Sequence, residues 1–212
     1  MARIAVIGGT GYAGRHIAAE AAQRGHTVLV VARKAVSERV EHAMYLEGSI
    51  ADVPTLVAEM QGVEVVVVAV PARGDMTGML RPAVAELSAH LPAEVRLGVV
   101  GGAGGSRVSP DGPRLVHTPE FAEEYKPEAL EALEILEDLE AGSRREWFYV
   151  HPAGGFGPWN PGERTGEYRD GGPVLVVDPD GDSYISGADL AVAVLDEIEN
   201  PRHTGEAFSV GY

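Results

Sequence analysis

The sequence predicts an α/β fold: a doubly wound parallel sheet in a single domain, with a small C-terminal lobe. Two observations predict it. Short apolar runs rich in β-branched residues alternate with stretches of helical periodicity along most of the 212 residues. The clearest run, VEVVVVAVP (63–71), is apolar without alternation, as expected for a parallel strand covered on both faces. Such alternation of strand and helix implies parallel strands joined by right-handed crossovers.

The first half of the chain begins with a buried strand, RIAVIG (3–8), and a helix at 14–25 that Gly25 ends. HTVLVVAR (26–33) is expected to be the second strand. ADVPTLVAEMQG (51–62) suits a helix, because Asp52 fits its N-cap and Gly62 its end. The strand at 63–71 follows directly.

In the second half, a helix is expected at 77–91 and a strand at 94–102. KPEALEALEILEDLEAG (126–142) repeats leucine every three residues, starts with a proline and ends with a glycine, all typical of a helix. A strand at 145–153, a helix at 187–200 and a terminal strand in EAFSVGY complete the order. The Gly-, Pro- and Asp-rich segment at about 154–186 is expected to be a hairpin or small excursion that contributes to the acceptor site.

Composition excludes several classes of function. The formal net charge of −15, from 32 acidic and 17 basic residues, argues against a nucleic-acid partner. The absence of cysteine excludes disulfides, thiolate metal sites and cysteine nucleophiles. No histidine spacing suggests a metal, and a turn is enough to explain DPDGD (178–182). No apolar run approaches the roughly 20 residues of a membrane span, and MARIAVIG does not resemble a signal peptide. We therefore expect a cytoplasmic protein without a membrane partner, either monomer or homodimer.

Three spaced glycines follow the first strand. GGTGYAG fits both G-x-x-G-x-x-G and G-x-G-x-x-G, and it lies between an expected strand and an expected helix, which is the context the motif requires. The start of such a helix offers free N–H groups and a positive dipole end to a pyrophosphate. The loop therefore predicts a Rossmann-type dinucleotide site that includes Gly8, Thr10, Gly11, Tyr12 and Gly14.

The end of the second strand favours NADP(H) over NAD(H). An NAD site usually has an acidic residue there, which binds the ribose 2′-hydroxyl. This chain has Arg33 and Lys34 instead. Arg33 could hold the 2′-phosphate of NADP(H) through charge-assisted hydrogen bonds. The alternative, a charged residue that merely leaves a strand, stays open.

The chain resembles the NAD(P)H-binding families of atypical short-chain dehydrogenases/reductases, specifically the bacterial NADH-flavin reductase group. The resemblance spans nearly the whole chain and rests on IAVIGGTGYAGRH, RLGVVGGAGG, RLVHTPEFAEEYKPEALEALEIL, HPAGGF, PGERTGEYR, YISGADLAVAVLDEIENPRH and FSVGY. It implies a Rossmann fold, a bound NAD(P)H and a small-molecule acceptor, with flavin as a possible substrate. The name flavin reductase constrains the reaction less than the fold.

Two positions depart from the pattern of that group. Relatives usually carry an aspartate after the third strand for the adenine edge, where YLEGSIADV has Ser49. HPAGGF has His151 where relatives often have a small polar residue, and a purely structural histidine stays open as the alternative. The further cofactor-binding residues expected at these strand ends are Ser49, Ile50, Ala69, Val70, Pro71, Gly101, His151, Pro152 and Ala153.

The Tyr-x-x-x-Lys pair of typical short-chain dehydrogenases is missing, because no tyrosine of this sequence has a lysine four residues later. EYKPEA places Tyr125 and Lys126 side by side at the start of the helix where that pair would otherwise lie. Lys126 could reach a cofactor ribose or phosphate, and Tyr125 could line the acceptor site. Both could equally be surface residues. Ser106, after GGAGG, is a weaker candidate proton donor.

Three functions follow from these observations. The favoured one is an NADPH-dependent reductase that passes hydride to a flavin or a similarly flat conjugated acceptor. That transfer needs stacking geometry more than a strong proton donor, which suits the missing tyrosine–lysine pair. The alternatives are a reductase or isomerase of a small carbonyl metabolite and a non-enzymatic NADP(H)-binding sensor.

Overall fold

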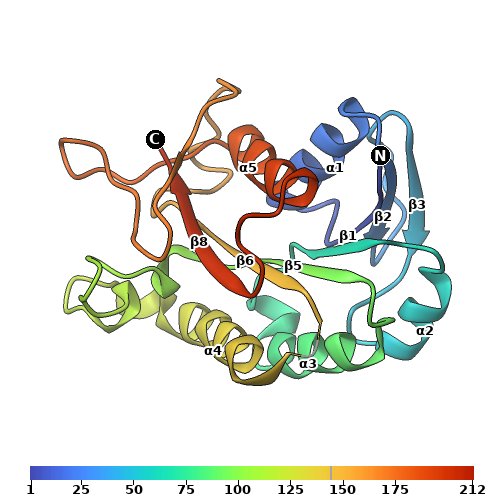
Figure 1. The fold of residues 1–212 in the computed structure, drawn as a ribbon, viewed down its shortest axis with the longest axis horizontal. Coiled ribbons are helices and arrows are strands. Elements are labelled where there is room, and N and C mark those ends of the chain that lie inside the picture. The colour runs from blue at the N-terminus through green and yellow to red at the C-terminus, as the bar shows by residue number, and fades with distance from the viewer. Residues whose placement is uncertain (144) are drawn as a thin grey trace.

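A computed structural model describes residues 1–143 and 145–212, in which one eight-stranded sheet carries helices on both faces (Figure 1). The sheet order is β3-β2-β1-β4-β5-β6-β8-β7, and the neighbouring strands are parallel except for the pair β7 and β8. The predicted doubly wound parallel sheet is confirmed. The strands are β1 (Arg3–Ile7), β2 (Thr27–Ala32), β3 (Ala43–Glu47), β4 (Val65–Val68), β5 (Arg96–Val100), β6 (Trp147–Pro152), β7 (Arg169–Asp170) and β8 (Glu206–Gly211).

The helices divide between the two faces of the sheet. Helices α1 and α5 cover one face, and α2, α3 and α4 cover the other (Figure 1). Helix α4 has the bounds expected from its leucine repeat, whereas α2 and α3 are shorter than expected because the chain turns before and after them. The helices are α1 (Tyr12–Gln23), α2 (Val53–Glu59), α3 (Leu80–His90), α4 (Lys126–Gly142) and α5 (Gly187–Glu199).

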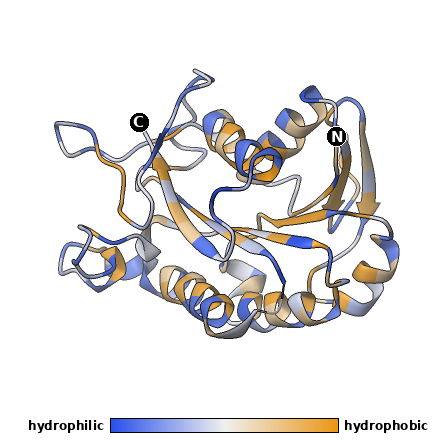
Figure 2. Cartoon of the chain, viewed as in Figure 1, coloured by the Kyte–Doolittle hydropathy of each residue, from blue (hydrophilic) through white to orange (hydrophobic). Residues whose placement is uncertain are grey.

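Both faces of the central strands are buried, which explains their unbroken apolar sequence. In β4, Val65 and Val67 belong to the core beneath α1 and α5, while Val66 and Val68 belong to the core beneath α2, α3 and α4. Figure 2 shows the same arrangement, with apolar residues concentrated in the strands at the centre of the molecule. A strand that packs against helices on both sides has no polar face, so its sequence does not alternate between apolar and polar residues.

Two long connections project from the same end of the sheet, on the left in Figure 1. One lies between β5 and α4, and the other is the excursion between β6 and α5 (residues 153–186), in which the short β7 pairs with β8. They are hydrogen-bonded to each other, because the Arg107 N–H donates to the Pro173 carbonyl oxygen at 2.8 Å and the Arg107 carbonyl oxygen accepts the N–H of Leu175 at 2.9 Å. The expected excursion is therefore present, though it is largely irregular.

The buried carboxylate of Asp189 in α5 anchors this excursion. It accepts the backbone N–H of Thr165 at 2.9 Å and that of Gly166 at 2.8 Å, and also the hydroxyl of Tyr212. Burial acts to raise the pKa of Asp189, but the hydrogen bonds from Tyr212, Thr165 and Gly166 outweigh it and hold the pKa below its usual value. The ionised carboxylate thus fixes the lobe to the body of the fold.

The DPDGD segment forms a turn, as expected. The Asp178 side chain accepts the N–H groups of Asp180 and Asp182, each at 2.9 Å. Within residues 1–143 and 145–212, no cluster of three or more histidine, aspartate or glutamate side chains is placed to hold a metal ion. Over the same residues, no helix is both long and apolar enough to cross a membrane.

Candidate cofactor site

The turn between β1 and α1 is built on glycine for reasons of close packing. Gly8 has a φ of +80°, in the left-handed region, and a Cβ there would lie 2.7 Å from the Ala69 carbonyl oxygen. A Cβ on Gly14 would collide with the backbone of Gly8 and Gly9. A Cβ on Gly11 would meet only the Gly8 carbonyl oxygen, at 3.2 Å, and beyond it the Ala69 oxygen at 4.0 Å. Gly8 and Gly14 therefore hold the turn together, while Gly11 faces the most open space.

The N-terminus of α1 is left without a cap. Gly11 occupies the N-cap position with no side chain to accept a hydrogen bond, and the first turn contains no acidic residue. The first N–H groups of a helix have no partner within it, and they carry the positive end of the helix dipole. The turn therefore fits the pyrophosphate of a dinucleotide, both in the donors that it presents and in the space above Gly11.

A cavity of about 400 Å³ opens beside this turn, at the carboxyl ends of β1, β2 and β4. Its size is within the range of small-molecule sites, roughly 300–1,000 Å³. It brings together nine residues that the sequence analysis assigned to the cofactor: Gly8, Thr10, Gly11, Arg33, Ser49, Ile50, Ala69, Val70 and Pro71. The structure adds lining residues that were not foreseen: Ile7, Val31, Ala32, Gly48, Arg73, Gly74, Asp75 and Met76.

Arg33 shares the mouth of this cavity with other charged side chains. Its guanidinium Nη1 lies 3.1 Å from a carboxylate oxygen of Asp75, which belongs to the 3-10 turn Gly74–Met76 after β4. Both side chains are largely exposed, at 64% and 88% of their full accessible surface. Arg73 from the same loop also lines the cavity, with Glu128 of α4 at 3.9 Å. The cavity mouth therefore carries charges of both signs. A signal for the loop was present in the sequence, since RGDMTG (73–78) follows the strand expected at 63–71 after the single residue Ala72.

Tyr12 points away from the cavity. Its hydroxyl donates to the Pro161 carbonyl and accepts the N–H of Gly187, each at 3.2 Å, and its ring packs against Phe156 with 5.2 Å between ring centroids. Its backbone N–H, like that of Gly14, belongs to the uncapped helix start. Both residues can therefore contribute to the cofactor site through the backbone.

The remaining expected cofactor residues lie at the ends of β5 and β6 and do not line the cavity. Gly101 packs against the Tyr149 ring, and Pro152 and Ala153 are buried. His151 is completely buried, and its Nδ1 lies 2.9 Å from the Gly102 carbonyl oxygen. Burial lowers the pKa of His151 to about 4, with a smaller contribution from Arg114 in the same direction, so the ring is neutral at pH 7. This placement favours the structural alternative for His151.

The structure does not bring the three catalytic candidates together. Tyr125 is 60% exposed at the start of α4, and Lys126 pairs with the exposed Glu123. Ser106 is completely buried, with its hydroxyl 2.8 Å from that of Ser209. The roles proposed for these residues stay predictions, and the burial of Ser106 leaves its hydroxyl no path to a substrate in this conformation.

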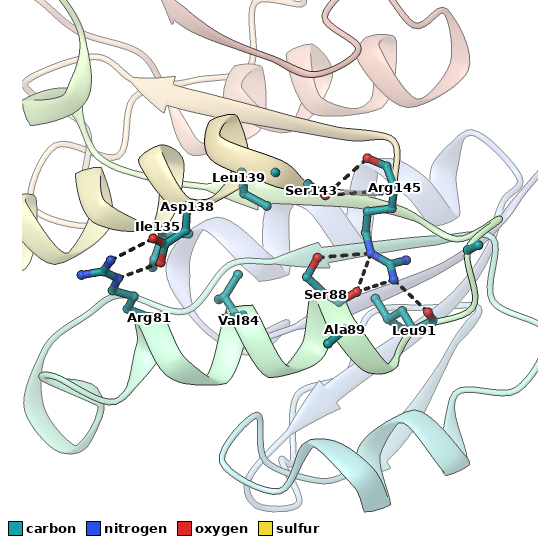
Figure 3. Close-up of a pocket in the computed structure, with 13 residues that line it drawn as sticks. Arg81, Val84, Ser88, Ala89, Leu91, Ile135, Asp138, Leu139, Ser143 and Arg145 are labelled. Atoms are coloured by element: carbon teal, nitrogen blue, oxygen red, sulfur yellow. Dashed lines mark hydrogen bonds and ion pairs between the residues drawn. The ribbon is translucent and has the colours of Figure 1, made fainter.

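A second cavity, of about 450 Å³, lies between α3 and α4 (Figure 3). Arg81 and Asp138 pair at one end, with 2.7 Å between Nε and Oδ2. Arg145 lies at the other end and donates to the carbonyl oxygens of Ser88 and Leu91 at the end of α3. These donors are occupied, and the cavity is lined by residues of α3 and α4 and of the segments that follow these helices, not by strand ends. It does not have the features of a cofactor site.

The sheet, the glycine turn and the adjoining cavity define a dinucleotide-binding protein of the Rossmann class. The chain belongs to the NAD(P)H-binding family, whose model matches residues 8–201. The resemblance drawn from its sequence motifs is thus confirmed.

Individual relatives cover the whole chain. YwnB of Bacillus subtilis, an uncharacterized protein, is 40% identical in an alignment of 212 positions that covers 98% of this chain and 97% of YwnB. A solved structure from Streptococcus pneumoniae, described as a "putative NADH-flavin reductase", is 32% identical with a TM-score of 0.89 and covers 100% of this chain and 99% of that chain. One from Burkholderia pseudomallei, described as a "putative exported protein", is 33% identical with a TM-score of 0.84 and covers 100% of both chains.

Proposed function

We propose that this protein is an NADPH-dependent reductase that transfers hydride to a flavin or a similarly flat conjugated acceptor. The observation that carries the proposal is the uncapped start of α1, which opens into the cavity that Arg33 lines. Membership of the NAD(P)H-binding family supports the cofactor class. The likeness to a "putative NADH-flavin reductase" from Streptococcus pneumoniae supports the acceptor class.

In this proposal each part of the site has one task. The backbone N–H groups of α1 hold the pyrophosphate, and Arg33 binds the 2′-phosphate and so favours NADPH. The ends of β4, β5 and β6 orient the nicotinamide, because ligands of open α/β sheets bind at the carboxyl ends of the strands. The reduced nicotinamide supplies the hydride.

The side chains expected near the acceptor favour a substrate whose reduction needs no strong acid from the protein. His151 is neutral and buried, Ser106 is completely buried, and Tyr125 is exposed at the start of α4. We assign the acceptor site to the side of the nicotinamide that the segment at 154–186 borders, with this segment as one wall. Phe156 packs against Tyr12 there, and Trp159 is 69% exposed and available to stack on a flat ring.

The test is acceptor-dependent oxidation of NADPH, followed at 25 °C with a panel of flavins, quinones and small carbonyl compounds. We expect turnover with flavins or quinones. Turnover restricted to carbonyl compounds would support the reductase or isomerase alternative. Tight NADP⁺ binding without turnover on any acceptor would support the sensor alternative.

We also propose a cytoplasmic location, as expected from the sequence. A structural relative from Burkholderia pseudomallei is described as exported, so the location needs its own test. Fractionation of cells that produce the tagged protein, with markers for each compartment, provides it.

A further inference from the structure

The usual carboxylate of an NAD site is missing from the end of β2, but a carboxylate reaches the same place from another element. NAD sites bind the ribose 2′-hydroxyl through an acidic residue at the end of the second strand. Here that strand end carries Arg33, and Asp75 from the loop after β4 lies 3.1 Å from its guanidinium. Both residues line the same cavity.

We propose that Arg33 and Asp75 read the ribose 2′ position together, and that Asp75 sets how strongly the protein prefers one nucleotide. Arg33 binds the 2′-phosphate of NADPH, while Asp75 accepts a hydrogen bond from the 2′-hydroxyl of NADH. The inference rests on the cofactor site of the proposed function and adds the residue that determines its specificity.

The charges explain why Asp75 acts in opposite directions on the two nucleotides. An ion pair this exposed is weak, so the 2′-phosphate can compete with Asp75 for Arg33. The Asp75 carboxylate then faces a second anion, which disfavours NADPH. With NADH no such anion is present. The pair stays intact, and the carboxylate remains available to the neutral ribose.

The backbone around Asp75 is fixed by the fold, although its side chain is exposed. Gly74 has a φ of +61°, which permits the tight turn, and the neighbouring Met76 is buried. The loop is then fastened to α4, because the Glu131 carboxylate accepts the N–H of Gly78 at 2.6 Å and that of Leu80 at 2.9 Å. A carboxylate carried on a fixed turn can recognise a hydroxyl without the cost of ordering a loop.

Arg73 is the other charged group that lines this cavity. It lies 3.9 Å from Glu128, so its charge is partly balanced by α4. Arg73 itself is unchanged in an Asp75 variant, so its guanidinium is present on both sides of the comparison that tests the proposal.

The test is the affinity of Asp75→Asn for NADP⁺ and for NAD⁺, measured by calorimetry at low and high salt. Without the repulsion between the Asp75 carboxylate and the 2′-phosphate, NADP⁺ should bind about two- to fivefold more tightly, which is the range of an exposed charge interaction. Replacement of the carboxylate by the weaker acceptor of a neutral amide should weaken NAD⁺ binding about two- to tenfold. The gain with NADP⁺ should shrink at high salt, because exposed charges are screened.

Asp138→Asn is the matched control, since Asp138 forms a partly exposed pair with Arg81 between α3 and α4, outside the lining of the cofactor cavity (Figure 3). It should change neither affinity. If Asp75→Asn changes the affinities for NADP⁺ and NAD⁺ in the same direction, or changes neither, the proposed role of Asp75 is overturned, whereas the assignment of the cofactor site is not. If the parent protein binds neither nucleotide, the proposed function is overturned as well.

Discussion

The hydroxyl of Tyr12 accepts the backbone N–H of Gly187 at 3.2 Å, which joins the first residue of α1 to the first residue of α5. The fit is close, because a Cβ on Gly187 would lie 2.9 Å from Cζ of Tyr12. The same hydroxyl donates to the Pro161 carbonyl in the excursion. The Tyr12 side chain therefore bonds the turn that would bind the cofactor to the lobe that would border the acceptor, in addition to the anchor that Asp189 provides.

Tyr12→Phe removes both hydrogen bonds and keeps the ring that packs against Phe156. At about 0.5–1.5 kcal/mol for each bond, the free energy of unfolding should fall by roughly 1–3 kcal/mol. NADP⁺ affinity should be retained, because the backbone N–H of residue 12 remains. The KM for the acceptor should rise more than kcat falls, because the excursion loses its bond to the start of α1 while its bonds to Asp189 remain.

Denaturant unfolding, calorimetry and steady-state kinetics measure these three effects. Tyr45→Phe is the control, since that hydroxyl accepts the N–H of Val40 at 2.8 Å at the β3 edge of the sheet. An equal loss of NADP⁺ affinity and acceptor affinity in Tyr12→Phe would contradict a role confined to the lobe.

Gly11→Val tests the proposed pyrophosphate site at the start of α1. The φ of −73° suits any residue, and the nearest atom to a Cβ is the Gly8 oxygen at 3.2 Å, so the fold should survive with a small shift. The added side chain should fill the space above the helix start and abolish NADP⁺ binding. Gly14→Ala should behave differently, because its Cβ collides with the Gly8 and Gly9 backbone and should lower the melting temperature. Unchanged NADP⁺ affinity in a folded Gly11→Val protein would refute the assignment of the site.

Arg33→Asp tests the choice of nucleotide. The substitution removes the partner of the 2′-phosphate and places a second carboxylate beside Asp75. A hydrogen bond to a charged group contributes about 1.5–3 kcal/mol, so NADPH affinity should fall roughly ten- to hundredfold relative to NADH. Arg39→Asp makes the same change of net charge on a guanidinium that lies over the Tyr45 ring, outside the cavity lining. It should shift the ratio of the two affinities far less, and an equal shift would indicate a long-range charge effect.

The part of the site that the sequence predicted is the part encoded by local signals. Gly8 and Gly11 follow an apolar run, and Ala69 and Pro71 end one, so their place at the carboxyl edge follows from strand order alone. Asp75 was missed, because its position depends on a turn that Glu131 holds from more than 50 residues away. No local pattern encodes such a contact.

Burial was the other property that the sequence did not reveal. His151 occupies a strand-end position where ligands usually bind, yet the turn after β5 covers it, because a Cβ on Gly105 would collide with its ring. Ser106 follows that turn and is buried against Ser209 of β8. Whether a strand-end side chain faces a ligand or a covering loop depends on the path of that loop. The excursion was foreseen from its glycine and proline content, but its bonds to Tyr12 and Asp189 were not.

His151 should make stability depend on pH. Its pKa lies near 4 in the folded protein and near 6.5 in the unfolded chain, so between these values the unfolded chain binds more protons. Stability should therefore fall as pH drops from 6.5 to 4, by up to about 3 kcal/mol. His151→Asn keeps a donor for the Gly102 carbonyl and should flatten this slope.

Urea unfolding at intervals between pH 4.5 and pH 7 measures the slope for both proteins. Burial, and then Arg15, also lower the pKa of His16, and this contribution is common to both proteins and cancels. Asp189, with a lowered pKa, loses its contribution only below the usual value of 3.8, outside this window. Identical slopes for the parent and His151→Asn would mean that His151 is not held neutral.

Tyr125→Phe separates the two enzymatic functions. Tyr125 is 60% exposed and its neighbour Lys126 is paired with Glu123, so nothing among the described residues positions the phenol hydroxyl as an acid. With a flavin acceptor, kcat should change only slightly, because the reaction has no carbonyl oxygen that must be protonated. If a carbonyl is reduced with Tyr125 as the acid, kcat should fall by roughly 10²–10⁴. Tyr168→Phe, whose hydroxyl bonds Asp196 at 3.1 Å, controls for the general loss of a phenol. Turnover of each variant with both acceptor types decides between the functions, and a large loss with flavin would contradict a transfer governed by stacking alone.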